Sequence, residues 1–411
     1  MKKLVNALAI LLLATSASAW EFMFSPLGWN VDLDMYGLPG QATGLRLGKT
    51  LVVSPYLECM YGYDSNTSLA SKSGRTGSSA ITTTAGATVA YTSLSLNTSL
   101  SGNLYYSMDR YQRAARDNRD SYGFQFSQRH GTPSGWSFTL SEGYVKGMGS
   151  SYLNGMSANR DTMSLGLGVG RSSPASLWTY SGNAAYERTS YASQYFNQND
   201  AVTAGLSLGR AISVKTMVNL SGGWSYRTSK NTDSITGYNF MAGMSSRLMP
   251  KTTYNISAGM NYSRSANGWS NWGASYNMGA GWKISPKWSA SLHGSTWLQP
   301  SEIASPYSGT VNYVSLYNTL GAGVNFIPVR KVSTTTQVLY RRGQYKSMDG
   351  HTASALNNCV DDLYMVRFAA SYALSRYLSL VASTQYQTVF SDLKQKEYDE
   401  YSASLGLRLK Y

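Results

Sequence analysis

The chain ends on Tyr401-Ser402-Ala403-Ser404-Leu405-Gly406-Leu407-Arg408-Leu409-Lys410-Tyr411. Its odd positions are aromatic or aliphatic, with one alanine, and its even positions are small, polar or basic. Successive side chains of a β-strand point to opposite faces, so this period of two predicts a strand with one apolar and one hydrated face.

The apolar face of this strand carries Leu405, Leu407 and Leu409 and finishes on the aromatic Tyr411. In this it resembles the terminal strand of bacterial outer-membrane β-barrels, which the barrel assembly machinery reads as a signal. The resemblance implies that these four residues form an assembly signal and that the machinery is a partner of the chain.

The amino terminus has the layout of a secretory signal peptide. Lys2 and Lys3 precede an apolar run over residues 4–14, and Ala17-Ser18-Ala19 forms a small-residue cleavage site. A membrane anchor is the alternative, but this run is too short to cross roughly 30 Å of hydrocarbon as a helix. We expect residues 1–19 to be removed during export.

The composition favours a membrane wall over a water-soluble core. The chain holds 32 tyrosines, 39 glycines and 10 tryptophans, and 14% of its residues are charged, whereas soluble proteins carry roughly 25%. No other stretch approaches the length of a transmembrane helix. Few charges and many aromatic residues are typical of strands that face lipid on one side and water on the other.

Period-two segments recur along the chain and are separated by polar or Gly/Pro connectors. Residues 93–108 show the pattern best, and they are long for a soluble strand but suited to one tilted through a bilayer. We count eighteen segments, at 51–63, 80–92, 93–108, 119–130, 135–147, 161–171, 176–188, 200–210, 214–227, 236–248, 252–264, 270–283, 287–298, 311–326, 331–344, 363–374, 377–390 and 400–411.

The connectors alternate in length, being tight after even-numbered segments and longer after odd-numbered ones. Outer-membrane barrels have short periplasmic turns and longer extracellular loops. The sequence therefore predicts an all-β fold: a single transmembrane antiparallel up-and-down β-barrel of eighteen strands, with sixteen as the alternative. The barrel occupies residues 49–411, and residues 20–48 form an amino-terminal segment that lies in the periplasm or the lumen.

Aromatic residues mark the expected membrane interfaces, where tyrosine and tryptophan prefer to lie. Seven tyrosines fall near the outer ends of rising strands on the lipid face, and three tryptophans fall at the opposite ends. These predicted belts consist of Tyr106, Tyr144, Tyr186, Tyr226, Tyr262, Tyr340, Tyr386, Trp136, Trp178 and Trp288.

The formal net charge is +14, and basic residues cluster at the tight turns. Arg171, Arg210, Lys251, Lys287 and Arg376 are examples, and these turns contain no acidic residue. Such side chains either anchor the periplasmic rim at anionic headgroups or draw anionic solutes and acidic polysaccharide toward the pore.

Strand register places several polar side chains in the lumen. They are Arg341, Arg367, Arg408, Gln337, Gln385 and Glu58. Arg341 and Arg367 fall on adjacent strands, and an arginine pair inside a pore favours anions by Coulomb attraction. The alternative is that these arginines are paired with carboxylates as part of the wall. Glu142 and Lys146 come out on the lipid face, so either a bulge shifts the register or both lie above the membrane.

No enzyme, metal or cofactor is expected. His293-Gly294-Ser295 has the spacing of an outer-membrane phospholipase, but His293 falls on the lumen face. Three histidines and two cysteines, Cys59 and Cys359, lack metal-ligand spacing; the cysteines are either bonded or two free thiols. Export and barrel patterning also exclude nucleic acid as the partner of this basic chain.

Gly62-Tyr63-Asp64-Ser65-Asn66, followed by tyrosine-rich strands such as Leu104-Tyr105-Tyr106, resembles the type 2 group of β-barrel porins. This resemblance implies an outer-membrane barrel tied to envelope polysaccharide. We expect a passive pore for small hydrophilic, anionic solutes in the bacterial outer membrane, in contact with lipids and lipopolysaccharide. The alternatives are a barrel for exopolysaccharide export or secretion, and a plugged structural or adhesive barrel.

Overall fold

The structure is a computed structural model that describes residues 44–47, 50–66, 77–93, 97–112, 118–150, 157–172, 176–192, 198–229, 232–249, 251–300, 313–347, 358–392, 394 and 397–411. The expected signal peptide and most of the segment 20–48 lie outside these ranges. Within them, no helix has the length and hydropathy needed to cross a membrane.

Nineteen strands make up the described fold. They are β1 (Leu45–Leu47), β2 (Leu51–Asp64), β3 (Ser78–Ser93), β4 (Thr98–Tyr111), β5 (Arg119–Gly131), β6 (Trp136–Ser150), β7 (Ser157–Ser172), β8 (Trp178–Tyr191), β9 (Asn199–Ala211), β10 (Thr216–Ser229), β11 (Thr232–Met249), β12 (Thr252–Ser265), β13 (Ser270–Trp282), β14 (Trp288–Pro300), β15 (Tyr313–Phe326), β16 (Val332–Ser347), β17 (Val360–Ala373), β18 (Leu378–Ser391) and β19 (Tyr398–Lys410).

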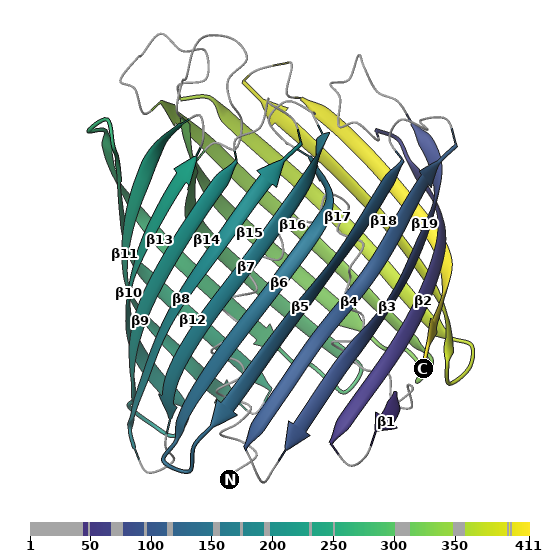
Figure 1. The fold of residues 1–411 in the computed structure, drawn as a ribbon, viewed down its shortest axis with the longest axis horizontal. Helices are drawn as coiled ribbons and strands as arrows, with labels where there is room; N and C mark the ends of the chain where they lie inside the picture. Colours follow the sequence, from purple (N-terminus) through teal and green to yellow (C-terminus); the bar gives the residue numbers. More distant parts are fainter. Residues whose placement is uncertain are drawn as a thin grey trace.

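Strands β2 to β19 form a closed antiparallel barrel in which every strand pairs with its neighbours in sequence (Figure 1). The ring closes where β19 pairs with β2, with Arg408 opposite Glu58. The prediction of eighteen strands is confirmed, and the sixteen-stranded alternative is wrong. Closure joins the two ends of the sheet, whose unpaired backbone groups would be costly in lipid; the shortest ladder in the ring is that of β13 and β14, which pair only over Asn277–Trp282 and Ala290–Ser295.

The short strand β1 was not expected from the sequence. It pairs antiparallel with the first residues of β2, with Leu45 opposite Val53 and Leu47 opposite Leu51. It therefore adds three residues to the wall next to the end of β19, where the amide of Tyr411 donates to the carbonyl of Pro55 at 3.0 Å. Residues 45–47, which belong to the expected amino-terminal segment, are thus part of the sheet.

The connections follow the predicted asymmetry, although the outer rim is uneven. At the tight turn between β5 and β6, the amide of Thr132 donates to the carbonyl of Trp136 at 2.8 Å. Gly135 has a φ of 85° there, a conformation that glycine adopts without steric cost. Two outer connections, at residues 230–231 and 266–269, are as short as the turns at the other end.

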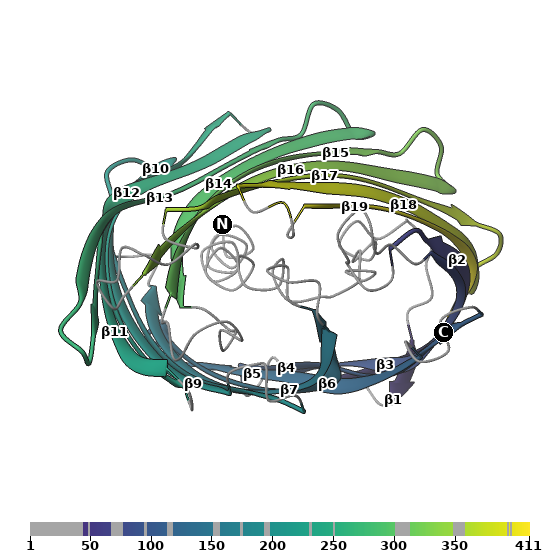
Figure 2. The ribbon, with the colours of Figure 1, turned by 90° about the horizontal axis from the view of Figure 1, so that it is seen from above.

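Large apolar side chains lie on the outside of the barrel. In β19, Leu405, Leu407 and Leu409 are about half exposed, while the alternating residues face the lumen. The main cluster of buried apolar side chains is instead on the lumen side, where Leu363, Val389 and Tyr398 lie opposite one another on β17, β18 and β19. Seen from above, the barrel is oblong, with β3–β7 along one long side and β14–β18 along the other (Figure 2).

No β-bulge interrupts β6, so the outward position of its two charged residues is not the result of a shifted register. The β6–β7 ladder is continuous from Trp136 to Ser150, so Glu142 and Lys146 share the outward face. Lys146 lies above Tyr144 and pairs with Asp161, their Nζ and Oδ1 atoms being 3.9 Å apart. Glu142 lies one outward position below Tyr144 and is exposed, which neither alternative drawn from the sequence anticipated.

Candidate functional site

The lumen wall near the middle of β17 carries a row of three polar side chains. The guanidinium-bearing Arg367 lies opposite Gln337 of β16 on one side and opposite Gln385 of β18 on the other. Alternation points all three inward, because Val338, Val366 and Tyr386 next to them in sequence are exposed on the outside. No carboxylate in the described part of the chain forms an ion pair with Arg367. We call these three residues the lumenal row.

Arg341 does not join the lumenal row. It lies opposite Leu363, four residues from the Gln337–Arg367 position, which is roughly 13 Å along the strand. Its guanidinium lies over the ring of Tyr317, with Cζ 5.0 Å from the ring centroid. The two arginines occupy adjacent strands, as the sequence indicated, but they do not form a local pair.

Arg408 and Glu58 meet at the closing seam of the barrel. Nε of Arg408 donates to Oε2 of Glu58 at 2.5 Å, and both side chains are largely buried. Arg408, which the sequence assigned to the lumen, is therefore part of a structural ion pair. It therefore ties β19 to β2 and leaves little free charge for a passing solute.

The acidic side chains of the outer half of the lumen also have partners. The hydroxyl groups of Tyr345 and Ser391 donate to the two carboxylate oxygens of Asp361, each at 2.5 Å. The amide of Gln387 donates to Glu400. These groups were not singled out from the sequence, since long connections separate them and only the register of β16 to β19 brings them together.

The predicted aromatic belts lie at the two ends of the outward face. Tyr106, Tyr226 and Tyr386 are exposed near the outer ends of rising strands, and Trp136, Trp178 and Trp288 are exposed at the lower ends. The remaining predicted tyrosines, Tyr144, Tyr186, Tyr262 and Tyr340, share the outward parity of their neighbours.

Basic side chains stack on the lower tryptophans. Cζ of Arg171 lies 5.5 Å from the ring centroid of Trp136, and Cζ of Arg210 lies 5.1 Å from that of Trp178. Both arginines therefore lie on the outward face. This placement favours anchoring at lipid headgroups over attraction of solutes into the pore.

The carboxy-terminal residue packs against the neighbouring turn. The ring of Tyr411 stacks on Tyr377, with centroids 5.3 Å apart and planes at 4°. Leu405, Leu407 and Leu409 point outward beside it. The four residues of the expected assembly signal thus form one apolar strip on the outside of β19.

The remaining candidates are dispersed. Cys59 is exposed in the middle of β2 and Cys359 is buried before β17, and the two are not joined in a disulfide. His293 points inward opposite Gly321. Within the described ranges, no group of histidine, cysteine or acidic side chains has the arrangement of a metal site.

The sequence matches neither a known family profile nor a curated protein. Among solved structures, the outer membrane protein OpdK of Pseudomonas aeruginosa is 11% identical, with 87% of this chain and 99% of that chain covered and a TM-score of 0.48. A BenF-like porin of Pseudomonas fluorescens Pf-5 is 12% identical, with 87% and 98% covered and a TM-score of 0.48. The FrpB iron transporter of Neisseria meningitidis is 9% identical, with 84% and 62% covered and a TM-score of 0.47.

Sequence identities this low say nothing about substrates. The architecture is established by the pairing of the strands. The barrel is closed, its outside is apolar, its lumen is lined with polar groups and aromatic belts lie at both ends. A closed barrel with an apolar band between aromatic girdles is the form in which strands span a membrane. The chain is a closed eighteen-stranded antiparallel β-barrel of the form that spans a membrane.

Proposed function

We propose that the protein is a passive pore for small hydrophilic solutes and that it prefers anions. The observation that carries this proposal is the lumenal row, in which Arg367 lacks a carboxylate partner among the described residues and is flanked by Gln337 and Gln385. A fixed positive charge in a narrow hydrated passage raises the local concentration of anions.

The seam of the barrel is compatible with the same preference. Glu58 is neutralised by Arg408, so this carboxylate adds no net negative charge to the lumen. Asp361 and Glu400 accept hydrogen bonds from neutral groups, which fix the positions of these carboxylates in the outer half of the lumen.

The test is reconstitution of the purified protein in a planar bilayer. The account predicts stepwise conductance and a reversal potential, under a potassium chloride gradient, of the sign expected for chloride preference. Absence of conductance in a correctly inserted barrel would instead support the plugged structural or adhesive barrel. Cation preference in an open channel would overturn the proposed selectivity.

A second candidate, export of an anionic polysaccharide, is favoured by basic residues on the inward face of the lower rim. Arg129 lies near the end of β5 and Lys410 at the end of β19, both with lumenal parity. The resemblance to polysaccharide-linked porins points the same way. Deletion of the gene would then cause a capsule defect and the barrel would co-purify with envelope synthesis proteins, whereas a pore for small solutes would show neither.

The strip of Leu405, Leu407, Leu409 and Tyr411 supports a further proposal, that the barrel assembly machinery recognises this strand. The outward apolar wall implies contact with membrane lipid, and we include lipopolysaccharide among the lipids in contact with the outer rim.

A further inference from the structure

Three ion pairs lie on the outward face of the barrel just above the tyrosine belt. They occupy three successive outer hairpins, β4–β5, β6–β7 and β8–β9, and in each the rising strand supplies the base and the falling strand the aspartate. We call this set the outer charge belt; it consists of Arg110–Asp120, Lys146–Asp161 and Arg188–Asp200.

The depth of the outer charge belt is set by the tyrosines below it. Lys146 and Arg188 each follow a belt tyrosine by two residues on the same face, in Tyr144-Val145-Lys146 and Tyr186-Glu187-Arg188. The hydroxyl of Tyr186 donates to Oδ1 of Asp200 at 2.7 Å. Tyrosine marks the headgroup level of a bilayer, so the charges above it lie within the headgroup layer.

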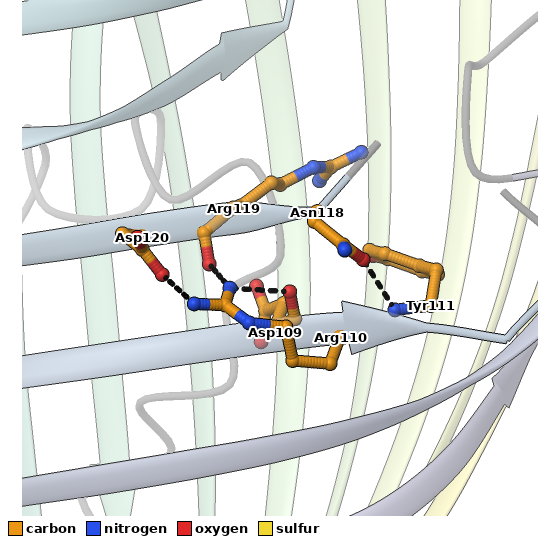
Figure 3. A network of polar contacts seen from close by, with 6 residues as sticks. All are labelled: Asp109, Arg110, Tyr111, Asn118, Arg119 and Asp120. Atoms are coloured by element: carbon orange, nitrogen blue, oxygen red, sulfur yellow. Dashed lines mark hydrogen bonds and ion pairs between the residues drawn. The ribbon is translucent and has the colours of Figure 1, made fainter. Parts of the chain in front are cut away.

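The basic groups are held in place and remain accessible. Nη2 of Arg110 lies 2.6 Å from Oδ1 of Asp120, and its Nη1 donates to the carbonyls of Asp109 and Arg119 at 3.1 and 3.0 Å (Figure 3). Arg119 itself extends away from this pair and lies over Tyr111. The side chains of Arg110, Lys146 and Arg188 are still 45%, 43% and 52% exposed.

Fixed and exposed bases are suited to binding phosphate. Arginine and lysine form charge-assisted hydrogen bonds with phosphate oxygens, and a guanidinium has five N–H donors, more than Arg110 uses here. The aspartates keep the basic side chains at the wall, which lowers the conformational entropy lost on binding. Consecutive hairpins are two strands, or roughly 10 Å, apart, so one headgroup carrying two phosphates can contact two of them.

We propose that the outer charge belt binds the phosphate groups of glycolipids in the outer leaflet. Lys146 and Arg188 contribute most, because their ion pairs are the loosest, at 3.9 and 3.8 Å. The proposal rests on the membrane placement of the barrel and names the lipid partner of its outer rim. It does not depend on whether the lumen conducts.

The experiment measures lipid retained by the purified full-length barrel, by native mass spectrometry after incubation with diphosphorylated lipid A. Lys146→Gln with Arg188→Gln is the test pair. Arg341→Gln with Arg367→Gln is the control, because it removes the same charge from the lumenal face of β16 and β17, which lipid does not reach. Both variants are first checked for heat-modifiable gel mobility, which reports a folded barrel.

The test pair is expected to bind diphosphorylated lipid A about tenfold more weakly, since each lost base contributes roughly a factor of three to five near a charged membrane surface. The control pair should bind as the wild type does. If the test and control pairs lost the same amount of binding, the proposal would be overturned. The same holds if the wild type bound dephosphorylated lipid A as tightly as the diphosphorylated form. If the wild type bound phosphatidylglycerol as tightly as diphosphorylated lipid A, the surface would bind anionic lipids in general and the proposal of a glycolipid site would be wrong. Conductance of the test pair should be unchanged, which separates this result from the pore proposal.

Discussion

Replacement of Arg367 by glutamine tests the origin of anion preference. The change removes one positive charge from the lumenal row and leaves a polar side chain between Gln337 and Gln385. Arg367 has no carboxylate partner among the described residues that the substitution would expose. We therefore expect the barrel to fold normally and to lose part of its selectivity.

The magnitude follows from Coulomb's law with screening. An ion passing about 7 Å from the guanidinium in water interacts with it by about 0.6 kcal/mol, which falls to about 0.3 kcal/mol in 0.1 M salt. This energy changes the concentration of anions and of cations by about 1.7-fold in opposite directions. The anion-to-cation permeability ratio should therefore fall about threefold in Arg367→Gln.

The assay is the reversal potential of single channels under a salt gradient, measured at two ionic strengths. In 1 M salt the Debye length is about 3 Å and the difference from wild type should almost vanish. Arg210→Gln, on the outward face, is the matched control and should not change the ratio. An unchanged ratio in Arg367→Gln at 0.1 M salt would refute the reasoning.

Three other predictions concern the wall. Glu58→Gln leaves Arg408 without its ion-pair partner and should lower the stability of the barrel by about 1–3 kcal/mol, measured as a lower temperature of unfolding in heat-modifiable gel mobility. The double variant Glu58→Gln with Arg408→Gln should recover part of this loss, and no recovery would contradict a pairwise interaction. Glu142→Leu removes a carboxylate from the lipid face and should raise the stability in urea titrations of vesicle-bound barrel by up to about 2 kcal/mol; a decrease would mean that Glu142 meets a polar partner. Tyr411→Ala removes the stacking on Tyr377 and should reduce the amount of barrel in outer-membrane fractions, whereas Tyr411→Phe should not; equal yields would contradict its role as an assembly signal.

The positions of the strands can be predicted from the sequence because a wall with lipid on one side and water on the other imposes a strict alternation of apolar and polar side chains. The predicted strand at 119–130 and β5 at Arg119–Gly131 differ by one residue. The lower turns are short and fix the register of the hairpins they close. Alternation alone was therefore enough to place Arg367, Gln337 and Gln385 on the inward face.

Contacts across the longer outer connections could not be read in the same way. Arg341 and Arg367 fall on strands joined by residues 348–359, and their offset depends on a register that such a connection does not fix. The partners of Lys146 and Arg188 lie beyond similar connections. The repeated Tyr-x-Lys/Arg pattern was visible in the sequence, but its meaning required the aspartates of the falling strands.

Thiol labelling along β8 tests the central claim, which is that this wall separates lipid from a hydrated lumen. Ser181 and Asn183 are exposed on the lumenal face, and Ala184 is exposed on the outward face. In a background with Cys59→Ser and Cys359→Ser, a membrane-impermeant thiol reagent should modify cysteine placed at 181 and 183 in intact vesicles but not at 184. Equal labelling at all three positions, or labelling at 184 alone, would contradict the account.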